Sequence, residues 1–275
     1  MHRIFAALIA LSGWSIGALA QTPLIEDLDP SYRAGAVIDR EASGEPRTPR
    51  LRVALGAGVG LAPRFEGSNH ERARLAPIVH LAYGPVFFGL GGLGVNLYRD
   101  ARWRFGANLG FGGGRRESTD DRLRGLGDVD RTVLAGLFAV YRNQQLLARA
   151  RVATDVGGQD QGTVARVDVF GRLRSGEGLA FFAGPGVTWA DRRHMQTFSG
   201  VTADQAARSG FPEFDAGAGV SSLRLSAGAA YRVDPRWRLV GITSLSRLRG
   251  DAAASPIIET RTQNAFFVSA IYLLR

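Results

Sequence analysis

Hydrophobic and polar residues alternate with a period of two along much of this chain. From Leu51 to Leu61 every odd position is apolar, and the even positions hold arginine, alanine or glycine. The same alternation returns from Arg102 to Phe111 and from Ser222 to Val233. Period two places successive side chains on opposite faces of a strand, and about ten residues suffice for a tilted strand to cross a bilayer. These segments therefore predict membrane-spanning β-strands.

Eight further segments have the length and composition of strands, which makes eleven. Bacterial single-chain barrels normally have an even number of strands. A turn at Gly89 to Gly94 would divide Val86 to Leu97 into two short strands and give twelve, with ten as the alternative. We therefore predict an all-β, transmembrane, antiparallel up-and-down β-barrel over residues 51–275. The further segments are Arg72 to Tyr83, Val86 to Leu97, Arg131 to Tyr141, Gln145 to Val156, Thr163 to Arg174, Leu179 to Ala190, Trp237 to Leu248 and Thr262 to Leu274.

Twelve strands also sort the connections by length. The short turns then share one end of the barrel, as periplasmic turns do, and the long loops share the other, as extracellular loops do. The long loops are Phe65 to Glu71, Gly113 to Asp130, Gly157 to Gly162, Asp191 to Ala216 and Gly250 to Arg261.

The first twenty residues have the pattern of a secretory signal peptide. Met1-His2-Arg3 is a short basic start, Ile4 to Leu11 is apolar, and Ala18-Leu19-Ala20 supplies the small residues that signal peptidase reads. The alternative, a short buried N-terminal helix, leaves these small residues unexplained. We expect cleavage after Ala20 and a periplasmic lead-in over residues 21–50. No later segment has the roughly 18 to 20 consecutive apolar residues of a transmembrane helix, so any span must be made of strands.

Charge and composition narrow the choice of partners. The chain has no cysteine, which excludes disulfides and thiolate metal sites. Its formal net charge is +9, and every basic residue is arginine. These arginines are scattered and belong to no nucleic-acid-binding motif, so we do not expect nucleic acid as a partner. Guanidinium groups bind phosphate in a bidentate fork, which suits outer-membrane lipid and lipopolysaccharide.

Arginines recur on the polar face of the expected strands. The interior of the barrel should therefore be basic, since only the outer face meets lipid. Two interpretations stay open, a packed interior held by salt bridges and a pore that favours anions. The residues in question are Arg104, Arg166, Arg172, Arg174, Arg224 and Arg232, with Asp168 among them.

Little in the sequence indicates catalysis or a cofactor. Gly89 to Gly94 fits G-x-G-x-x-G, but no helix follows it, so a barrel turn is the better interpretation than nucleotide binding. His70 and His194 fall in loops. His80 shares an inward face with Ala76, Ile78 and Ala82, and that strand supplies no serine or carboxylate as a partner. We predict neither an enzyme nor a cofactor.

Acidic residues in the expected loops could bind a divalent cation through oxygen ligands. Their spacing matches no calcium loop, so we interpret them as solvated charge and predict no metal site. They are Glu66, Glu71, Asp120, Asp121, Asp128, Asp130, Asp191 and Asp251.

Short stretches near the strand ends form an ordered series. They are Gly56 to Gly60 followed by Pro63, Glu66, Gly67 and Ser68; Pro77; Gly127 and Asp128 within Leu126 to Asp130; Trp189 to Asp191 and Met195 to Phe198; Gly200, Val201, Thr202, Ala206, Ser209 and Gly210; and Ser255 and Pro256 before Ile257-Ile258. The series resembles the family of MltA-interacting protein and OmpV, outer-membrane proteins of Gram-negative bacteria. Two departures are Ser199, which interrupts an aromatic-Gly-Val run, and Arg275 in place of a terminal aromatic residue.

The resemblance implies a scaffold at the cell envelope. Members of this family are described as linking a murein-degrading lytic transglycosylase to a murein-synthesising penicillin-binding protein. Two other functions stay open, a pore for small solutes, anions or drugs, and surface adhesion through Asp191 to Ala216. The first predicts measurable conductance, and the second predicts binding by that loop alone.

Overall fold

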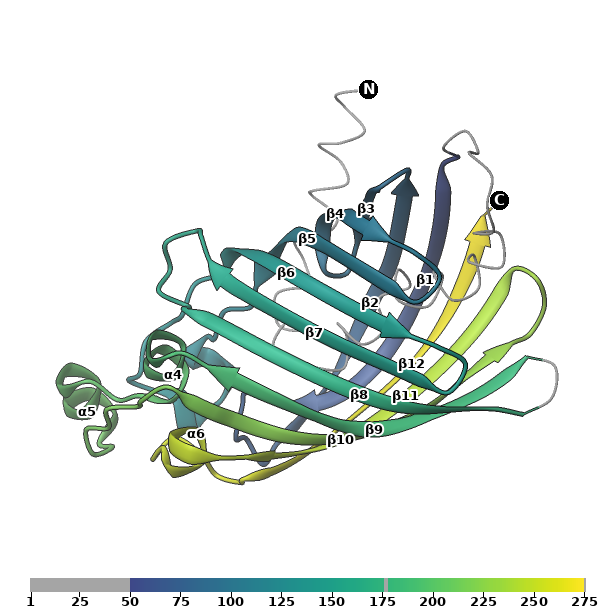
Figure 1. Cartoon of the computed structure of the whole chain (residues 1–275). Coiled ribbons are helices and arrows are strands. Elements are labelled where there is room, and N and C mark those ends of the chain that lie inside the picture. The colour runs from purple at the N-terminus through teal and green to yellow at the C-terminus, as the bar shows by residue number, and fades with distance from the viewer. Residues whose placement is uncertain (1–49, 176–177, 275) are drawn as a thin grey trace.

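The computed structural model of the protein describes residues 50–175 and 178–274. Within these residues twelve antiparallel strands close into one barrel, in which the first strand pairs with the last (Figure 1). The all-β fold and the strand number twelve are thus confirmed. The signal peptide and residues 21–49 of the lead-in lie outside the described residues. The strands are β1 (Arg52–Pro63), β2 (Glu71–Tyr83), β3 (Val86–Gly89), β4 (Gly92–Arg99), β5 (Trp103–Gly112), β6 (Thr132–Arg142), β7 (Leu146–Asp155), β8 (Thr163–Ser175), β9 (Leu179–Ala190), β10 (Gly219–Arg232), β11 (Trp237–Leu248) and β12 (Thr262–Leu274).

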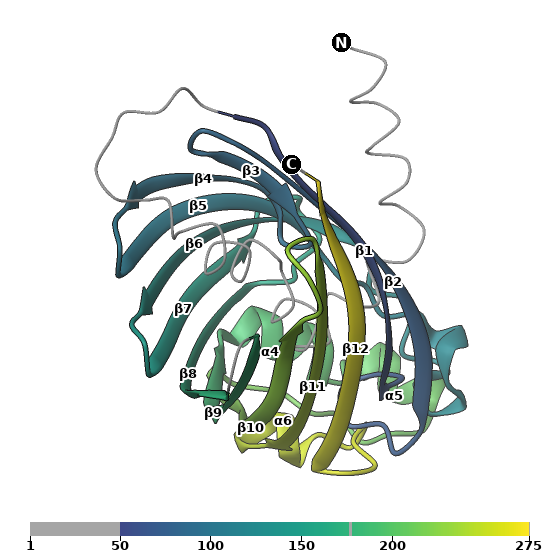
Figure 2. The ribbon, with the colours of Figure 1, turned by 90° about the vertical axis from the view of Figure 1, so that its right-hand side faces the viewer.

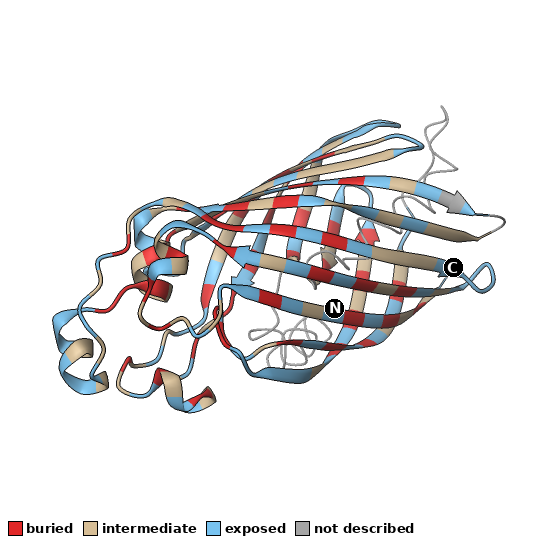
Figure 3. Cartoon of the chain, turned by 90° about the horizontal axis from the view of Figure 1, so that it is seen from below, coloured by how far each residue is buried: buried red, intermediate tan, exposed pale blue. Residues whose placement is uncertain are grey.

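Exposed and buried residues alternate along the strands (Figure 3). On β1, Leu55, Val59 and Leu61 are exposed, whereas Gly58 and Gly60 between them are buried. Large apolar side chains thus point outward on nearly every strand, which is the face that lipid covers in a membrane barrel. The period-two alternation in the sequence thus corresponds to the outward and inward faces of the barrel wall.

Connections of two kinds occupy the two ends of the barrel. At one end, which we call the turn end, tight turns join the strands. β1 starts at this end beside the end of β12, since Val53 pairs with Leu274. At the other, the loop end, long loops carry short helices (Figure 2). No helix among the described residues is long and apolar enough to cross a membrane. The helices are η2 (Glu117–Thr119), η3 (Asp121–Leu123), α4 (Arg192–Ser199), α5 (Ala203–Ser209) and α6 (Gly250–Ala254).

Side chains within the turns explain why the chain reverses so sharply. Asp100 Oδ1 accepts hydrogen bonds from the amides two and three residues ahead, at 2.7 and 2.6 Å. Asn143 and Asp234 do the same in their own turns. Such local side-chain bonds replace backbone partners that a turn lacks. Aromatic pairs, Trp103 with Tyr141 and Trp237 with Tyr272, surround the same end, as at a membrane interface.

The pairing between β2 and β3 is the shortest in the described barrel. β2 pairs with β1 from Glu71 to Ala82, whereas its pairs with β3 are confined to Leu81 to Tyr83. β3 is short because the chain turns back at Leu90-Gly91, which confirms the expected division of this segment. Gly92 follows with a φ of 94°, and a Cβ there would lie 2.0 Å from the carbonyl oxygen of Leu109, so this turn requires glycine.

Candidate functional site

The five long loops fold together into a cap over the loop end (Figures 1 and 2). We define the cap as residues 64–70, 113–131, 156–162, 191–218 and 249–261. Four of these loops share one buried apolar cluster, whose members are each at most 5% exposed. Burying such a side chain stabilises by about 1.5–3 kcal/mol, so the cap is a packed unit. The cluster consists of Phe65, Leu123, Leu126, Val201 and Ile257.

The remaining loop joins the cap through Gln161, which is buried. Its Nε2 donates to the carbonyl oxygens of Gly113 and Asp130, at 2.9 and 2.6 Å. Its own carbonyl oxygen is 2.8 Å from Nδ1 of His194 on α4. Because a carbonyl can only accept, Nδ1 of His194 carries the hydrogen. Burial lowers the pKa of His194, with Arg166 acting in the same direction.

Capping residues define the two helices of the longest loop. Asp191 accepts from the amide of His194 at the start of α4. α5 begins with a capping box, in which Thr202 and Gln205 each bond the other's backbone amide, and ends at Gly210 in the left-handed conformation. Each such cap stabilises a helix by about 1 kcal/mol. The family-motif residues Thr202 and Gly210 thus mark helix ends.

Other family-motif residues tie the cap's loops to one another. Ser255 Oγ donates to the carbonyl oxygen of Ser199 at 2.6 Å, and Arg122 donates to that of Pro256 at 2.6 Å. The departure from the family at Ser199 therefore leaves this backbone contact in place. Pro63 ends β1 just before the cap. The rest lie within the cap: Gly67 (φ 94°) packs on Ile258, Ser68 bonds His70, Gly127 (φ 74°) donates to Glu117, Asp128 accepts from Arg116, Gly200 ends α4, Val201 joins the buried cluster, and Ser209 bonds Gln205.

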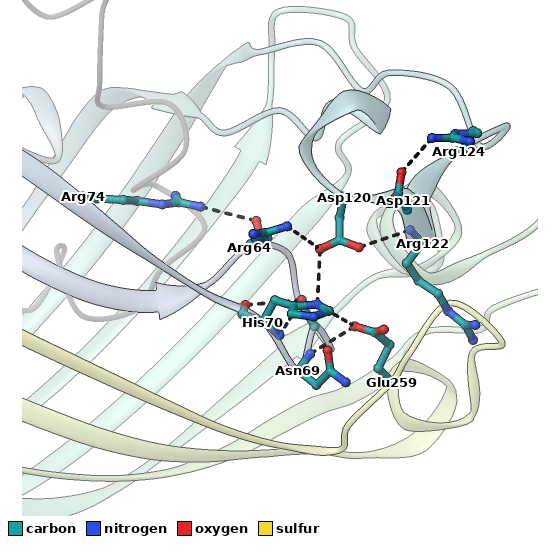
Figure 4. A network of polar contacts seen from close by, with 10 residues as sticks. Arg64, Asn69, His70, Arg74, Asp120, Asp121, Arg122, Arg124 and Glu259 are labelled. Carbon is teal, nitrogen blue, oxygen red and sulfur yellow. Dashed lines mark hydrogen bonds and ion pairs between the residues drawn. The ribbon is translucent and has the colours of Figure 1, made fainter.

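An ionic joint connects three loops of the cap (Figure 4). His70 Nδ1 lies 3.6 Å from Asp120 Oδ2 and 4.0 Å from Glu259 Oε2, and Arg64 Nη1 lies 3.4 Å from the same Asp120 oxygen. One ligand atom from each of His70, Asp120 and Glu259 falls within a 4.8 Å group that could hold a cation. The guanidinium already neutralises Asp120, so the arrangement serves first as an ion-pair joint. Sequence patterns pointed to Asp120 and His70 separately but not to Glu259 or to their meeting, because the residues come together only through the fold.

Beneath the cap lies a basic cavity of about 180 Å³, which we call the chamber. Its floor and walls include hydroxyl and amide side chains from β9 to β12. Among the described lining residues five guanidinium groups face one carboxylate. The charged lining residues are Arg64, Glu66, Arg74, Arg115, Arg151 and Arg166.

Burial shifts the pKa of both Glu66 and Arg115 in the chamber. Arg115 is 5% exposed, and this burial lowers its pKa to about 10. Protein surrounds Glu66 where it lines the cavity, and the resulting loss of bulk solvation raises its pKa although Arg166 opposes the shift. Both residues belong to the cap, and sequence reasoning placed only Glu66 among residues of interest.

Lower on the inner wall, Asp168 joins two arginines. Asp168 Oδ2 is 3.3 Å from Arg149 on β7, and its Oδ1 accepts from Arg224 on β10. The second bond passes over β9, where the register sets Gly186 between Asp168 and Arg224. A Cβ on Gly186 would lie 2.2 Å from Asp168 Oδ1. Glycine at position 186 therefore leaves the space through which Arg224 of β10 reaches Asp168 of β8.

The arginines predicted to line the lumen occupy inward positions of their strands. Arg224 is buried, Arg104, Arg166 and Arg172 are half-buried, and Arg232 is exposed at the turn end. Arg104 lies over the ring of Phe138, Arg166 is 3.5 Å from Thr188 Oγ1, and Arg172 donates to Asn143. A role in passing anions stays a prediction for them.

His80 is buried on the inner wall of β2. The register sets it opposite Ala54, and Ile78 and Ala82 flank it on the same face. These three neighbours offer no hydroxyl or carboxylate for a catalytic pair.

Similar barrels occur among solved structures. An outer membrane channel from Pseudomonas putida F1 aligns with a TM-score of 0.40 and 11% identity over 85% of this chain and 98% of that one. The translocator domain of the autotransporter NalP from Neisseria meningitidis aligns with a TM-score of 0.41 and 11% identity, over 95% and 99%.

Sequence comparison is more specific. The MltA-interacting protein of Escherichia coli (strain K12) is 27% identical over 214 residues, which are 76% of this chain and 84% of that protein, and the MltA-interacting protein of Shigella flexneri gives the same values. The family profile described as MltA-interacting protein MipA matches residues 55–274, from β1 to β12 with the whole cap between them. The resemblance found in the loops is confirmed, and the chain belongs to the MltA-interacting protein MipA family.

Proposed function

We propose that this protein is a non-catalytic scaffold of the outer membrane that holds a lytic transglycosylase, together with a penicillin-binding protein, at the cell envelope. The observation that carries the proposal is family membership, because the curated relatives are named for interacting with MltA. The cleaved signal peptide expected at residues 1–20 would deliver the chain to this location.

The orientation of the barrel decides which surface meets the partner. The apolar exterior is expected to contact outer-membrane lipid and lipopolysaccharide, with the turn end facing the periplasm. Murein lies in the periplasm, so enzymes that cut or build it would meet the turn end and residues 21–50.

Among the described residues of the turn end, exposed positive charge outweighs the negative charge that remains available to a partner. Hydrogen bonds from backbone amides hold the pKa of Asp100 and Asp234 below the usual range, so these carboxylates are committed to their own turns. Exposed Arg102, Arg232 and Arg236 project around them. We therefore expect the docking surface of the partner to be acidic.

Charge reversal at the turn end tests the proposal. Arg102→Glu with Arg236→Glu should reduce capture of a lytic transglycosylase at least ten-fold in pull-downs from detergent-solubilised envelopes, read by mass spectrometry. The matched control is Arg124→Glu with Arg192→Glu, which reverses two exposed cap arginines. Unheated gel migration must show that both variants are folded. The scaffold proposal fails if the wild type captures no murein enzyme above an unrelated barrel.

A further inference from the structure

We propose that the chamber beneath the cap binds a small oxyanion of the size and charge of phosphate. This site is at the loop end and does not depend on the proposed docking at the turn end.

The first argument is the excess of positive charge around one small space. Its guanidinium groups come from separate elements: Arg64 from the first loop, Arg74 from β2, Arg115 from residues 113–131, Arg151 from β7 and Arg166 from β8. Arg151 and Arg166 are directly opposite each other in the β7–β8 register. An anion between them would meet a guanidinium group from each strand.

The second argument is the state of Arg115. Its Nη1 donates to the carbonyl oxygen of Phe198 at 2.9 Å, but its Nε and Nη2 are buried without a hydrogen-bond partner. Nε and Nη2 form one edge of the guanidinium, the edge that binds two oxygens of a phosphate in parallel. A buried charged donor without a partner is costly. Arg115 lines the chamber, and an anion bound there would supply the partner that this edge lacks once the side chain turns toward it.

The third argument is the fit of the remaining lining. The cavity of about 180 Å³ is several times the roughly 30 Å³ of one water, so phosphate and bound waters fit. Hydroxyl groups of Ser222, Ser244 and Ser246 and the amide of Asn264 add neutral donors. Glu66 is the one carboxylate among the described lining residues, set against five guanidinium groups.

The test is calorimetric titration of the full mature protein in nonionic detergent. Sodium phosphate is added at constant ionic strength, with sodium chloride as the reference titration. We expect saturable binding to one site by the wild type. Arg115→Gln should weaken it ten-fold or more, as expected for lost charge-assisted hydrogen bonds. Arg192→Gln, which removes an exposed cap arginine paired with Asp215 outside the chamber, should leave it unchanged.

Glu66→Gln is the second variant, because misfolding of Arg115→Gln would also abolish binding. It removes the opposing carboxylate and should tighten phosphate binding several-fold at neutral pH, a gain that misfolding does not produce. The turn-end variant Arg102→Glu with Arg236→Glu should bind phosphate like the wild type, which separates this site from the docking surface. The proposal is overturned if the wild type shows no saturable heat, or if Arg115→Gln and Glu66→Gln both bind as the wild type does.

Discussion

Replacing Asp168 by asparagine tests how the inner wall holds its charges. Asp168 lies between Arg149 and Arg224, and the Arg224 side chain is 1% exposed with two of its nitrogens buried without a partner. Asparagine keeps the size of the side chain but removes the negative charge. Arginine does not deprotonate in proteins. The variant therefore leaves Arg149 and Arg224 without the carboxylate that they share.

The structure sets the size of the effect. At 3.3 Å and an effective dielectric constant of about 20, Coulomb's law gives about 5 kcal/mol for the Arg149–Asp168 pair. Desolvation offsets much of this attraction, yet removing one partner still costs about 3–5 kcal/mol because a buried charge remains. The exposed pair Arg192–Asp215 should contribute at most about 1 kcal/mol. Asp168→Asn and Asp215→Asn should therefore differ several-fold in the free energy of unfolding that they cost.

Urea unfolding of the detergent-folded barrel, followed by tryptophan fluorescence and by unheated gel migration, measures this difference. The double variant Asp168→Leu with Arg224→Met should recover part of the lost stability, because it removes one of the two buried cations together with the carboxylate. If Asp168→Asn unfolds within about 1 kcal/mol of the wild type, as an exposed pair would, lumen water solvates these arginines and the reasoning is refuted.

Three further predictions concern single positions. Gly186→Ala should lower the free energy of unfolding by about 1–3 kcal/mol, since its Cβ meets the bridging carboxylate, whereas Gly241→Ala, whose nearest contact is at 3.9 Å, should cost less in the same urea titration. Burial lowers the pKa of His194, so the folded cap favours the neutral imidazole, and the stability it provides is lost as the pH falls below the ordinary value of about 6.5. Proteolysis of residues 191–218 should accelerate from pH 7 to pH 5, and an equal acceleration in His194→Gln would contradict this assignment. Thr202→Ala should cost the cap about 1 kcal/mol, seen as faster cleavage of the same loop at neutral pH; unchanged cleavage would show that α5 does not depend on its capping box.

The wall of the barrel was predictable because each strand carries its own signal. β9, β11 and β12 begin and end where the period-two pattern does. β10 shows the limit of that signal, since it starts at Gly219 rather than Ser222. Its pairing with β9 shifts register between Val220 and Ser222, and such a bulge breaks the alternation on which the prediction rests.

The cap was not predictable from periodicity. Its helices are too short to show a 3.6-residue repeat over several turns, although the Thr202–Gln205 capping box and Gly210 mark α5 locally. Its apolar cluster takes residues from four loops, and its ionic joint joins His70 to Glu259. Contacts of this kind are set by tertiary packing. For the same reason the sequence singled out Asp168 and Arg224 as inward-facing residues but indicated neither their contact nor the part played by Arg149.

Because the β2–β3 ladder is so short, fewer hydrogen bonds hold these two strands together than hold most other neighbouring strands of the barrel. From Glu71 to His80, β2 has ladder partners on β1, while the described pairs on its other edge begin at Leu81. Pro77 lies on this stretch and has no amide hydrogen to offer, a residue that sheets tolerate at edges. Of the other ladders in the described barrel only β3–β4 is comparably short, and there the turn at Leu90-Gly91 joins the two strands. Parting the wall at any of the rest would break a longer ladder, at a high cost in hydrocarbon. The barrel therefore has one line along which it opens sideways most easily, and a lipid-embedded molecule exchanging with the interior, or a strand added by another protein, would enter between β2 and β3.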